Sequence, residues 1–485
     1  MKNSFVFSYS TCKIARLTIP QNFFTKEQLF FVLSKKINYK ILAPLCLFLN
    51  SEQLSSIRCC LARSLCFFEK KEIYDTLTSC AEHLFLLHLL NVKILMIMTN
   101  KFITQSIKYI GVDDNDIDLF ESQYIVPNGI SYNSYLIEDE KIAIMDTVDA
   151  RKGDEWLPLL NKELAGRQPD FLVVHHLEPD HASLIAKVLE LYPNVKIVTS
   201  DRAAKMLPQF FEGVDFSNCV ISVKEGDSLS LGKHNLKFFA APMVHWPEVI
   251  VSYEETEKIV FSADGFGKFG ALAHDEEWAC EARRYYFNIC GKYGVQVQAL
   301  LKKLATLDVA CICPLHGPIL NDNLGYYIGL YDCWSKYEVE TDGIFIAYAS
   351  IHGGTAAAAN KLADMLRAKG APKVSVADLC RDDMAEAVED AFRMSKLVLC
   401  AASYDGGVFP PMHDFLHHLQ IKNFQKRKVG ILENGSWAPC AGRVMKGMLE
   451  SMKDIEIAEN SVTIMSRMKQ TDLAAMEALA DEMLK

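Results

Sequence analysis

Four side chains that commonly bind metal ions lie within six residues near the middle of the chain. They are His176, Glu178, Asp180 and His181. The apolar run 171–174 before them predicts a buried strand, and residues 183–191 after them have the pattern of a helix. Carboxylates beside a helix N-terminus are favoured because that end carries partial positive charge. A strand that leads into a ligand-rich loop and then into a helix predicts a metal site.

The spacing within this loop indicates room for two ions. If the loop keeps the alternation of a strand, positions 176, 178 and 180 project to one side, and His181 approaches the same or a neighbouring ion from the other. His175 lies next to the motif, and we expect its ring to make a hydrogen bond instead. A solvated acidic turn with incidental histidines is the alternative interpretation.

Three further candidate ligands each follow an apolar run that predicts a strand. They are His245 after residues 238–244, Asp264 after residues 259–263, and His316 after residues 309–315. A single buried His or Asp at the end of a strand often has a structural role and bonds to the backbone. Together with the first loop, however, these residues give seven ligands, which is enough for two metals with open coordination positions.

The elements that must position these ligands follow two patterns. Short alternating runs between residues 109 and 145 predict antiparallel strands, with Asn128-Gly129 as the strongest turn signal, and hence a layered sandwich with helices outside. An acidic stretch, 338–342, then marks a boundary. Beyond it, predicted strands alternate with predicted helices, which is typical of a doubly wound parallel sheet. The strands are expected at 343–349, 373–377, 397–402 and 428–432.

Ligands of such sheets bind at the loops that follow the strands. The first of these loops is Ser350, Ile351, His352, Gly353, Gly354 and Thr355. Its hydroxyls, its glycines and a helix that begins at Thr355 predict a nest of N–H donors for a phosphate. Because the loop has no lysine, a monophosphate fits it better than a nucleoside triphosphate with magnesium.

Two more loops combine aromatic rings with glycines that let the backbone approach a flat ring system. One contains Ser403, Tyr404, Asp405, Gly406 and Gly407, and the other contains Asn434, Gly435, Ser436 and Trp437. Tyr404 and Trp437 are the candidates for stacking. Glycine-rich turns of an ordinary α/β domain are the alternative interpretation.

Composition limits the classes of function. A net charge of -10 disfavours binding to nucleic acid or to anionic membranes. The 15 cysteines form no C-x-x-C pair and no secretory signal is recognisable, which favours reduced thiols in a cytoplasmic protein. Residues 1–97 lack clean periodicity, and we expect an atypical, poorly ordered extension there. A targeting or membrane-associating segment is the alternative.

The order of the seven ligands resembles the metallo-β-lactamase-like domain of the flavodiiron proteins, also called A-type flavoproteins. Three stretches around the ligands match that family as well: Met243–Pro247, Phe261–Gly267 and Leu315–Pro318. The three loops resemble the FMN site of the family's flavodoxin-like domain, although Gly354 stands where Asn is common and His352 where an aromatic residue is common. The resemblance covers Lys101–Lys485.

This resemblance implies an αββα metallo-β-lactamase-like sandwich followed by a doubly wound flavodoxin-like parallel sheet. The implied parts are the extension (1–97), a di-iron domain (98–342) and an FMN domain (343–485). One iron would be held by His176, Glu178 and His245, the other by Asp180, His181 and His316, and Asp264 would bridge them. No catalytic residue beyond these ligands is implied. Hydrolases of this fold usually have His where this chain has Glu178, and a carboxylate suits redox-active iron better than zinc.

The implied activity is the reduction of dioxygen to water, of nitric oxide to nitrous oxide, or of both. Electrons would pass from an external donor, such as rubredoxin or a reduced deazaflavin, through FMN to the non-haem irons. Reduced FMN gives two electrons and two ferrous ions give two more, which matches the need of dioxygen. The family also implies a head-to-tail homodimer or a tetramer, without a membrane or nucleic-acid partner.

Two other functions stay open at this point. One is a zinc hydrolase of the same sandwich fold with an appended flavin domain, and the other is a flavin electron carrier without turnover. Several aromatic residues lie close to the ligands in sequence, and we expect them to fill the core rather than to shield the metals. They are Trp246, Phe266, Phe269, Tyr285 and Tyr286.

Overall fold

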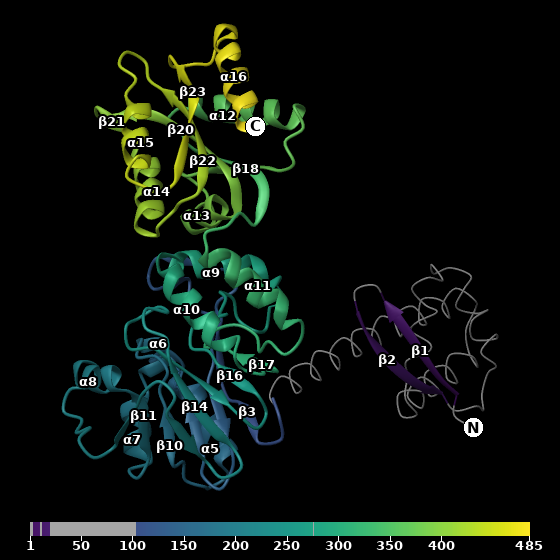
Figure 1. Ribbon diagram of the computed structural model, residues 1–485, viewed down its shortest axis with the longest axis vertical. Helices are drawn as coiled ribbons and strands as arrows, with labels where there is room; N and C mark the ends of the chain where they lie inside the picture. Colours follow the sequence, from purple (N-terminus) through teal and green to yellow (C-terminus); the bar gives the residue numbers. More distant parts are fainter. Residues whose placement is uncertain (1–2, 10–11, 20–102, 275) are drawn as a thin grey trace, which may run out of the picture. The chain divides into compact units, whose positions relative to one another are not determined.

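The computed structural model describes residues 3–9, 12–19, 103–274 and 276–485 (Figure 1). The chain divides into two compact units, Met1–Asn100 and Lys101–Lys485. In the first unit the described residues form an antiparallel pair of strands, β1 (Asn3–Tyr9) and β2 (Cys12–Ile19). The rest of the predicted extension, 1–97, lies outside the described residues, so its expected disorder stays a prediction.

The second unit begins with two sheets whose strands are ordered β12-β11-β10-β9-β8-β3 and β13-β14-β15-β16-β17. The first sheet comprises β3 (Ile107–Tyr109), β8 (Tyr135–Ile137), β9 (Ala143–Met145), β10 (Phe171–Val173), β11 (Lys196–Ser200) and β12 (Val220–Val223). The second comprises β13 (Ser228–Ser230), β14 (Asn235–Ala240), β15 (Ile250–Glu254), β16 (Ile259–Phe261) and β17 (Cys311–Cys313). Two short ribbons pair β4 (Val112–Asp114) with β7 (Ile130–Tyr132) and β5 (Leu119–Phe120) with β6 (Tyr124–Ile125).

Because successive side chains of a strand point to opposite faces of the sheet, one apolar run contributes to two hydrophobic cores. In β10, Phe171 and Val173 belong to the core between the sheets, whereas Leu172 packs among the helices. The helices on that outer face are α5 (Gly153–Leu164), α7 (Ile185–Leu191) and α8 (Asp201–Phe210). Those on the outer face of the second sheet are α9 (Trp278–Ile289), α10 (Gly294–Leu304) and α11 (Leu324–Ser335). The layers run helix, sheet, sheet, helix, which confirms the predicted αββα sandwich.

The remainder of the second unit is a parallel sheet in the order β19-β18-β20-β22-β23. Its strands are β18 (Thr341–Ala349), β19 (Val374–Asp378), β20 (Met394–Tyr404), β22 (Arg427–Asn434) and β23 (Ile455–Ile464), and the short β21 (Gly407–Val408) pairs with β20. One face carries α13 (Met384–Arg393), α14 (Pro410–Ile421) and α15 (Ala441–Leu449), and the other carries α12 (Gly354–Ala368) and α16 (Leu473–Leu484), as Figure 1 shows. The predicted doubly wound, flavodoxin-like sheet is confirmed.

One strand of this sheet escaped the sequence analysis. β23 is an edge strand, and its register against β22 shifts between the pairs Val429–Ile457 and Ile431–Ser461. The extra residues and the polar run Glu459-Asn460-Ser461 break the apolar alternation that would have predicted it. Among the described residues, none of the helices has both the length and the apolar character that crossing a lipid bilayer requires.

Buried arginines occupy the place where the sandwich meets the parallel sheet. Arg427 is 3% exposed and donates to the carbonyl oxygens of Met394 (2.7 Å), Tyr337 (2.9 Å) and Glu338 (3.0 Å). Arg283 of α9 makes two hydrogen bonds to Glu340, at 2.6 and 2.7 Å. These contacts fix the starts of β20 and β22 against the sandwich.

Replacing Arg427 with leucine should destabilise this junction. The carbonyl oxygens that now accept its hydrogen bonds would be left buried without a donor, at about 1–3 kcal/mol each. We expect the free energy of unfolding in urea to fall by about 3 kcal/mol or more. Lys361→Leu, at an exposed position of α12, should change it by less than about 0.5 kcal/mol. Equal stability of the Arg427→Leu protein and the wild type would contradict the assigned role.

Candidate metal centre and cofactor loops

The seven predicted metal ligands follow strands that end at one edge of the sandwich. In the second sheet, β14 and β16 run in the same direction because both pair antiparallel with β15, and β17 is parallel to β16. The loops after these three strands carry His245, Asp264 and His316, and the segment after β10 carries the other four ligands. Strand direction therefore collects residues that are up to 140 positions apart in the sequence.

The seven side chains form two adjacent groups. His176, Glu178, His245 and Asp264 make the first group, and Asp180, His181 and His316 make the second; in each group, one potential ligand atom per residue lies within 4.8 Å of the others. In the first group, Glu178 Oε2 is 3.1 Å from His176 Nε2 and 2.9 Å from His245 Nε2. In the second, Asp180 Oδ2 is 3.3 Å from His181 Nε2 and 3.2 Å from His316 Nε2.

Asp264 contacts both groups. Its Oδ2 lies 3.3 Å from His176 Nε2 and 3.2 Å from His245 Nε2, whereas its Oδ1 lies 3.2 Å from His181 Nε2. The two oxygens of one carboxylate thus point toward different groups, which is the geometry of a ligand that bridges two ions. The division of the side chains coincides with the one that the family resemblance implies.

Many of these ligand atoms are buried without a hydrogen bond of acceptable geometry. Among the described residues, the unpaired atoms include both carboxylate oxygens of Asp180 and of Asp264, both ring nitrogens of His181, and Nε2 of His316. A buried polar atom without a partner costs about 1–3 kcal/mol, so a purely structural role does not account for so many in one place. Cations bound between these atoms would satisfy them, and a set of imidazoles and carboxylates fits a pair of iron ions.

Mutual attraction sets the pKa values in this cluster. Burial opposes the charged form of His245, but the adjacent carboxylates of Asp264 and Glu178 outweigh burial and raise its pKa to about 9. Burial also acts against the ionised forms of Glu178 and Asp264, yet the surrounding histidines lower the pKa of both carboxyls. Both are therefore carboxylates at neutral pH, which is the form that binds metals.

Residues behind the ligands orient two of the rings. His176 Nδ1 is hydrogen-bonded to Glu248 Oε1 at 2.8 Å, and the same oxygen accepts the Leu177 N–H at 3.1 Å. His316 Nδ1 donates to the Ser131 carbonyl oxygen at 2.7 Å. Each bond leaves Nε2 free to face the cluster. Sequence analysis missed Glu248, although an acidic residue three positions after a ligand histidine, in Trp246-Pro247-Glu248, was a usable signal.

His175 has the hydrogen-bonding role that was predicted for it. Its Nδ1 lies 2.5 Å from Asp146 Oδ2 and its Nε2 lies 2.7 Å from Ser252 Oγ, while its backbone N–H donates to Asp146 Oδ1 at 2.7 Å. All three side chains are at most 1% exposed. The ring therefore links the loop after β10 to the second sheet and points away from the two ligand groups.

Two details of the backbone differ from the sequence-based expectation. The strand-like alternation does not continue past residue 178, because Pro179–Ala182 forms a helical turn, α6, with proline at the position where its fixed φ favours a helix. Asp180 and His181 are consequently neighbours in one turn, and both reach the second group. β14 ends at Ala240 instead of residue 244, because Pro242 lacks an N–H and Met243 has a φ of 65°.

The turn between β5 and β6 brings one more carboxyl group to the centre. Glu121 accepts a hydrogen bond from the Gln123 amide at 3.2 Å, and burial of its carboxyl together with repulsion by Glu178 raises the pKa of Glu121 to about 7. Glu121 and Ser122 have φ values of 48° and 57°, which cost roughly 1–2 kcal/mol at each non-glycine residue. Sequence analysis did not identify Glu121, because a single acid in a short hairpin carries no ligand pattern.

Aromatic side chains pack against the second group of ligands. The rings of Phe120 and Tyr285 lie 5.4 and 5.6 Å from the His316 ring, and Phe269 contacts both of them at 5.6 and 5.1 Å. Tyr285 and Phe269 are 1% and 0% exposed. Phe269 and Tyr285 fill the core, as expected, and the core that they fill adjoins the ligands.

The three predicted flavin loops all lie at the carboxyl edge of the parallel sheet. Gly353 has a φ of 81° and directly precedes α12, and Ser350 Oγ accepts its N–H at 3.1 Å. A Cβ atom on Gly354 would lie 2.4 Å from the Ser466 carbonyl oxygen, so only glycine fits there. Tyr404 is 45% exposed and Trp437 is 90% exposed. The first turn of α12 could bind a phosphate, and the exposed rings of Tyr404 and Trp437 could cover a flat ring system. Together they fit a phosphorylated, flat ligand.

Some of the predicted flavin residues hold the loops together. Ser403 Oγ accepts the N–H groups of Cys440 and Ala441 at 2.8 and 3.0 Å. The Asn434 amide donates to the Ser466 carbonyl oxygen at 2.9 Å and accepts the Ser466 N–H at 3.1 Å. Ser466 follows β23, so this fourth loop was missed together with its strand.

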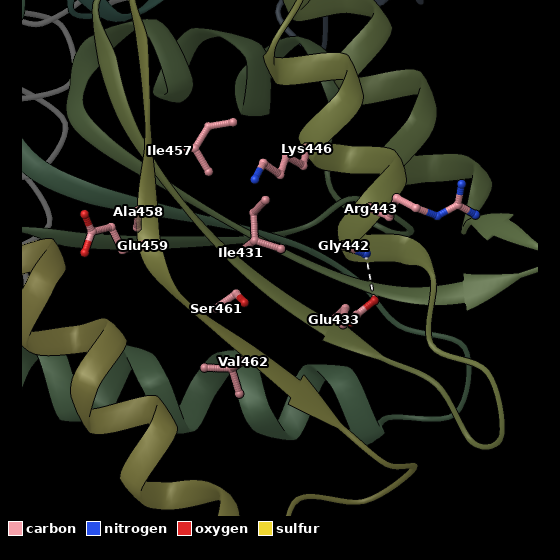
Figure 2. Close-up of a pocket in the computed structure, with 10 residues that line it drawn as sticks. All are labelled: Ile431, Glu433, Gly442, Arg443, Lys446, Ile457, Ala458, Glu459, Ser461 and Val462. Atoms are coloured by element: carbon pink, nitrogen blue, oxygen red, sulfur yellow. Dashed lines mark hydrogen bonds between the residues drawn. The ribbon is translucent and has the colours of Figure 1, made fainter.

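A cavity of about 240 Å³ lies elsewhere on the same sheet, between α15 and strands β22 and β23 (Figure 2). Its lining includes Ile431, Ser461 and Lys446, and Glu433 at its border accepts the Gly442 N–H at 2.8 Å. It contains none of the metal ligands.

Comparison with known proteins agrees with this architecture. Residues 130–317 match the family model described as ODP family beta lactamase. The nitric oxide reductase of Moorella thermoacetica is 30% identical over 380 residues, which cover 75% of this chain and 92% of that protein. The anaerobic nitric oxide reductase flavorubredoxin of Vibrio vulnificus is 27% identical over 347 residues, which cover 69% of this chain and 70% of that protein.

Solved structures show the same fold. The rubredoxin oxygen:oxidoreductase of Desulfovibrio gigas superposes with a TM-score of 0.74 at 26% identity, covering 79% of this chain and 97% of that one. The flavodiiron protein of Giardia intestinalis gives a TM-score of 0.73 at 22% identity, covering 79% and 96%, and this likeness concerns the fold alone. With a relative matched along nearly its full length and with the sandwich, the sheet and the paired ligand groups in place, the chain belongs to the flavodiiron protein family.

Proposed function

We propose that this protein is an oxidoreductase that reduces dioxygen to water, nitric oxide to nitrous oxide, or both. The observation that carries the proposal is the pair of ligand groups joined by Asp264, with Glu178 as an oxygen ligand in the first group. Relatives named for oxygen and nitric oxide reduction support it. In this proposal residues 98–342 are the metal domain and residues 343–485 the flavin domain.

The proposed ligands are His176, Glu178 and His245 for one iron, Asp180, His181 and His316 for the other, and Asp264 as the bridge. When bound, the two irons and FMN would supply the electrons for the reduction. Glu248 and the Ser131 carbonyl fix the tautomers of His176 and His316, so that Nε2 is the atom presented to the metal. The ionised carboxylates offset the charge of the cations.

The proposed flavin site uses the three loops at the carboxyl edge of the parallel sheet. Ser350, Gly353, Gly354 and Thr355 would hold the phosphate through N–H groups at the start of α12. Tyr404 and Trp437, which are exposed at the same edge, would cover the isoalloxazine ring. Ser403, Asn434 and Ser466 act by fixing the shape of the loops. The monophosphate expected for this nest makes FMN the proposed flavin.

The length of β20 supports electron transfer from the flavin of one chain to the irons of another copy of the chain. Met394, at the start of β20, belongs to the junction with the sandwich, whereas Tyr404, at its end, belongs to the flavin loops. An eleven-residue strand spans about 33 Å. A flavin at Tyr404 is therefore remote from the sandwich of its own chain, which supports the proposed head-to-tail homodimer or a tetramer built from it. An external carrier such as rubredoxin or a reduced deazaflavin is the proposed donor.

Glu178→Ala should abolish gas reduction without affecting the flavin. Removal of this carboxylate takes away a shared ligand of the first group, so we expect turnover to fall by about 100-fold or more. Iron per chain should decrease while the flavin absorbance stays unchanged. The measurements are metal analysis, the visible spectrum, and anaerobic stopped-flow of the photoreduced protein with each gas. Glu190→Ala, which removes an exposed acid of α7, is the matched control and should behave like the wild type.

The same measurements decide between the proposed function and its alternatives. Zinc in place of iron in protein purified with iron supplied would favour a hydrolase. Bound FMN and iron without consumption of either gas would favour an electron carrier. Full activity of the Glu178→Ala protein would refute the assignment of the site.

Gly354→Val should prevent flavin binding and leave the irons in place. The added side chain would meet the Ser466 carbonyl oxygen and the Asn434 amide, which a Cβ would approach to 2.4 and 3.2 Å. We expect at least a tenfold loss of bound flavin by absorbance, with iron unchanged. Gly447→Ala in α15, where a Cβ meets nothing within 4 Å, is the control. A flavin-replete Gly354→Val protein would exclude this loop from the site.

Mixing the two inactive variants should restore activity if the dimer is head to tail. A Glu178→Ala chain supplies a working flavin, and a Gly354→Val chain supplies working metals, so each mixed dimer contains one complete site. Random co-expression should give about a quarter of the wild-type activity per chain, because half of the dimers are mixed and each has one of two sites. The absence of activity in isolated mixed dimers would contradict exchange between copies.

A further inference from the structure

The loop that carries the metal ligand His316 follows β17 of the second sheet, but a segment from the other half of the sandwich holds it. The loop comprises residues 314–317, and the segment that binds it, 131–135, runs from the end of β7 to the start of β8. Asn133 lies between these two strands, is 0% exposed, and contacts the loop on both sides of the histidine. The position of His316 therefore depends on a residue that is remote from it in sequence.

Every polar group of the Asn133 side chain has a partner. Its Nδ2 donates to the carbonyl oxygens of Pro314 and Gly317, each at 2.8 Å. Its Oδ1 accepts the hydroxyl of Tyr109, in β3, at 3.0 Å, and its backbone N–H donates to the Leu315 carbonyl oxygen at 2.8 Å. Because carbonyl oxygens only accept hydrogen bonds, the amide nitrogen must be the atom that faces the loop.

Two neighbours of this asparagine bind the same loop. Ser131 accepts His316 Nδ1 through its carbonyl oxygen and the Gly317 N–H through its Oγ, both at 2.7 Å. The Tyr135 hydroxyl donates to the Pro314 carbonyl oxygen at 2.6 Å. The segment 131–135 thus holds the ring of the histidine as well as the backbone before and after it.

The hydrogen-bond pattern requires a short primary amide at position 133. One nitrogen atom donates to two carbonyl oxygens, which lie two positions before and one position after His316. A carboxylate of the same shape would place negative charge against both oxygens, a hydroxyl has a single hydrogen, and an apolar side chain has none. Each carbonyl oxygen left buried without a donor costs about 1–3 kcal/mol. The loop would therefore move to regain partners.

A small movement of this loop would disturb the second ligand group more than the first. His316 Nε2 lies 3.2 Å from Asp180 Oδ2, in its own group, and 3.8 Å from Asp264 Oδ1. The first group takes none of its four ligands from residues 314–317. Because metal–ligand distances are kept within about 0.2 Å, a displaced His316 ring would weaken the hold on one ion of the pair.

We propose that Asn133 is a positioning residue for the second ligand group: its two amide hydrogen bonds fix the 314–317 loop and so set His316 to hold one of the two ions. The inference rests on the proposed function and deepens it, because it makes the retention of one ion depend on a residue that the other does not need. Asn133 is assigned no contact with the ions or the gas.

Asn133→Asp tests the proposal in the full-length iron- and flavin-loaded protein, because it exchanges the amide for a carboxylate of the same shape. We expect the affinity for one iron to fall by about 10- to 100-fold, as is usual for changes behind a metal ligand. Dialysis against increasing chelator concentrations should therefore leave about one iron per chain under conditions where the wild type retains both. The absorbance of the bound flavin should stay at the wild-type level.

Two ligand variants identify which iron is lost. His316→Ala removes a ligand of the second group, and His245→Ala removes one of the first. The Mössbauer spectrum of the iron that remains in Asn133→Asp should match that of His316→Ala and differ from that of His245→Ala. A match to His245→Ala, or equal loss of both irons, would overturn the proposal.

A second buried asparagine is the matched control for lost stability. Asn288 in α9 is 6% exposed, and its amide also donates to two carbonyl oxygens, those of Arg284 at 2.8 Å and Ala385 at 3.2 Å. Asn288→Asp should lower the midpoint of thermal unfolding, as Asn133→Asp does, but keep both irons and the wild-type spectrum. Selective loss of one iron in this control as well would show that general destabilisation causes the effect, and the proposal would fail.

Asn133→Ser takes the place of the aspartate variant if that protein does not fold, since the hydroxyl keeps one donor. The same iron should be released first, and a serine variant that releases iron as the wild type does would refute the proposal. A wild-type protein that binds no iron, or consumes neither gas, defeats the proposed function, and this inference falls with it. An active wild type with two irons, beside an Asn133→Asp protein with the same iron release, defeats the inference alone.

Discussion

The burial of many ionisable groups in one place is the constraint on which this structure depends. Asp264 is 1% exposed, His176 and His316 are not exposed at all, and the Nε2 atoms of the two histidines lie 3.3 and 3.8 Å from the Asp264 carboxylate. Such a cluster is costly without cations, because buried charges need partners. The two packed sheets form a rigid frame of short strands. The ligands lie on the loops that follow these strands, so the frame holds the buried charges together. Asp264 contacts both halves of the cluster.

Sequence alone predicts the parts of this arrangement that are local. The ligands from His176 to His181 form a dense motif after an apolar strand, and the flavin loops carry glycines and aromatic rings at the ends of alternating strands. Both the fold class and the grouping of the ligands were accessible in this way, the latter through the family resemblance. The role of His175 followed from its place beside the motif.

What sequence analysis missed depends on contacts between distant segments. Glu248 acts on His176 across 72 positions, and Glu121 lies in a two-residue turn that takes up left-handed conformations. β23 is polar and irregular because it lies at an edge and carries a register shift, so its pattern resembles a loop. The helical turn at Pro179 was hidden by the expectation that alternation continues beyond the strand. The partner of Glu248 is set by a tertiary contact, whereas the turn at Pro179 follows from a local proline.

The parallel sheet contributes to the metal domain at one end and to the flavin loops at the other. Near the starts of β20 and β22, Arg427 and Lys422 donate hydrogen bonds to the carbonyl oxygens of Met394, Tyr337 and Asn288. At the ends of the same strands, the loops leave Tyr404 and Trp437 uncovered. The eleven residues of β20 separate these two ends of the sheet. The proposed exchange of electrons between two copies of the chain rests on this separation.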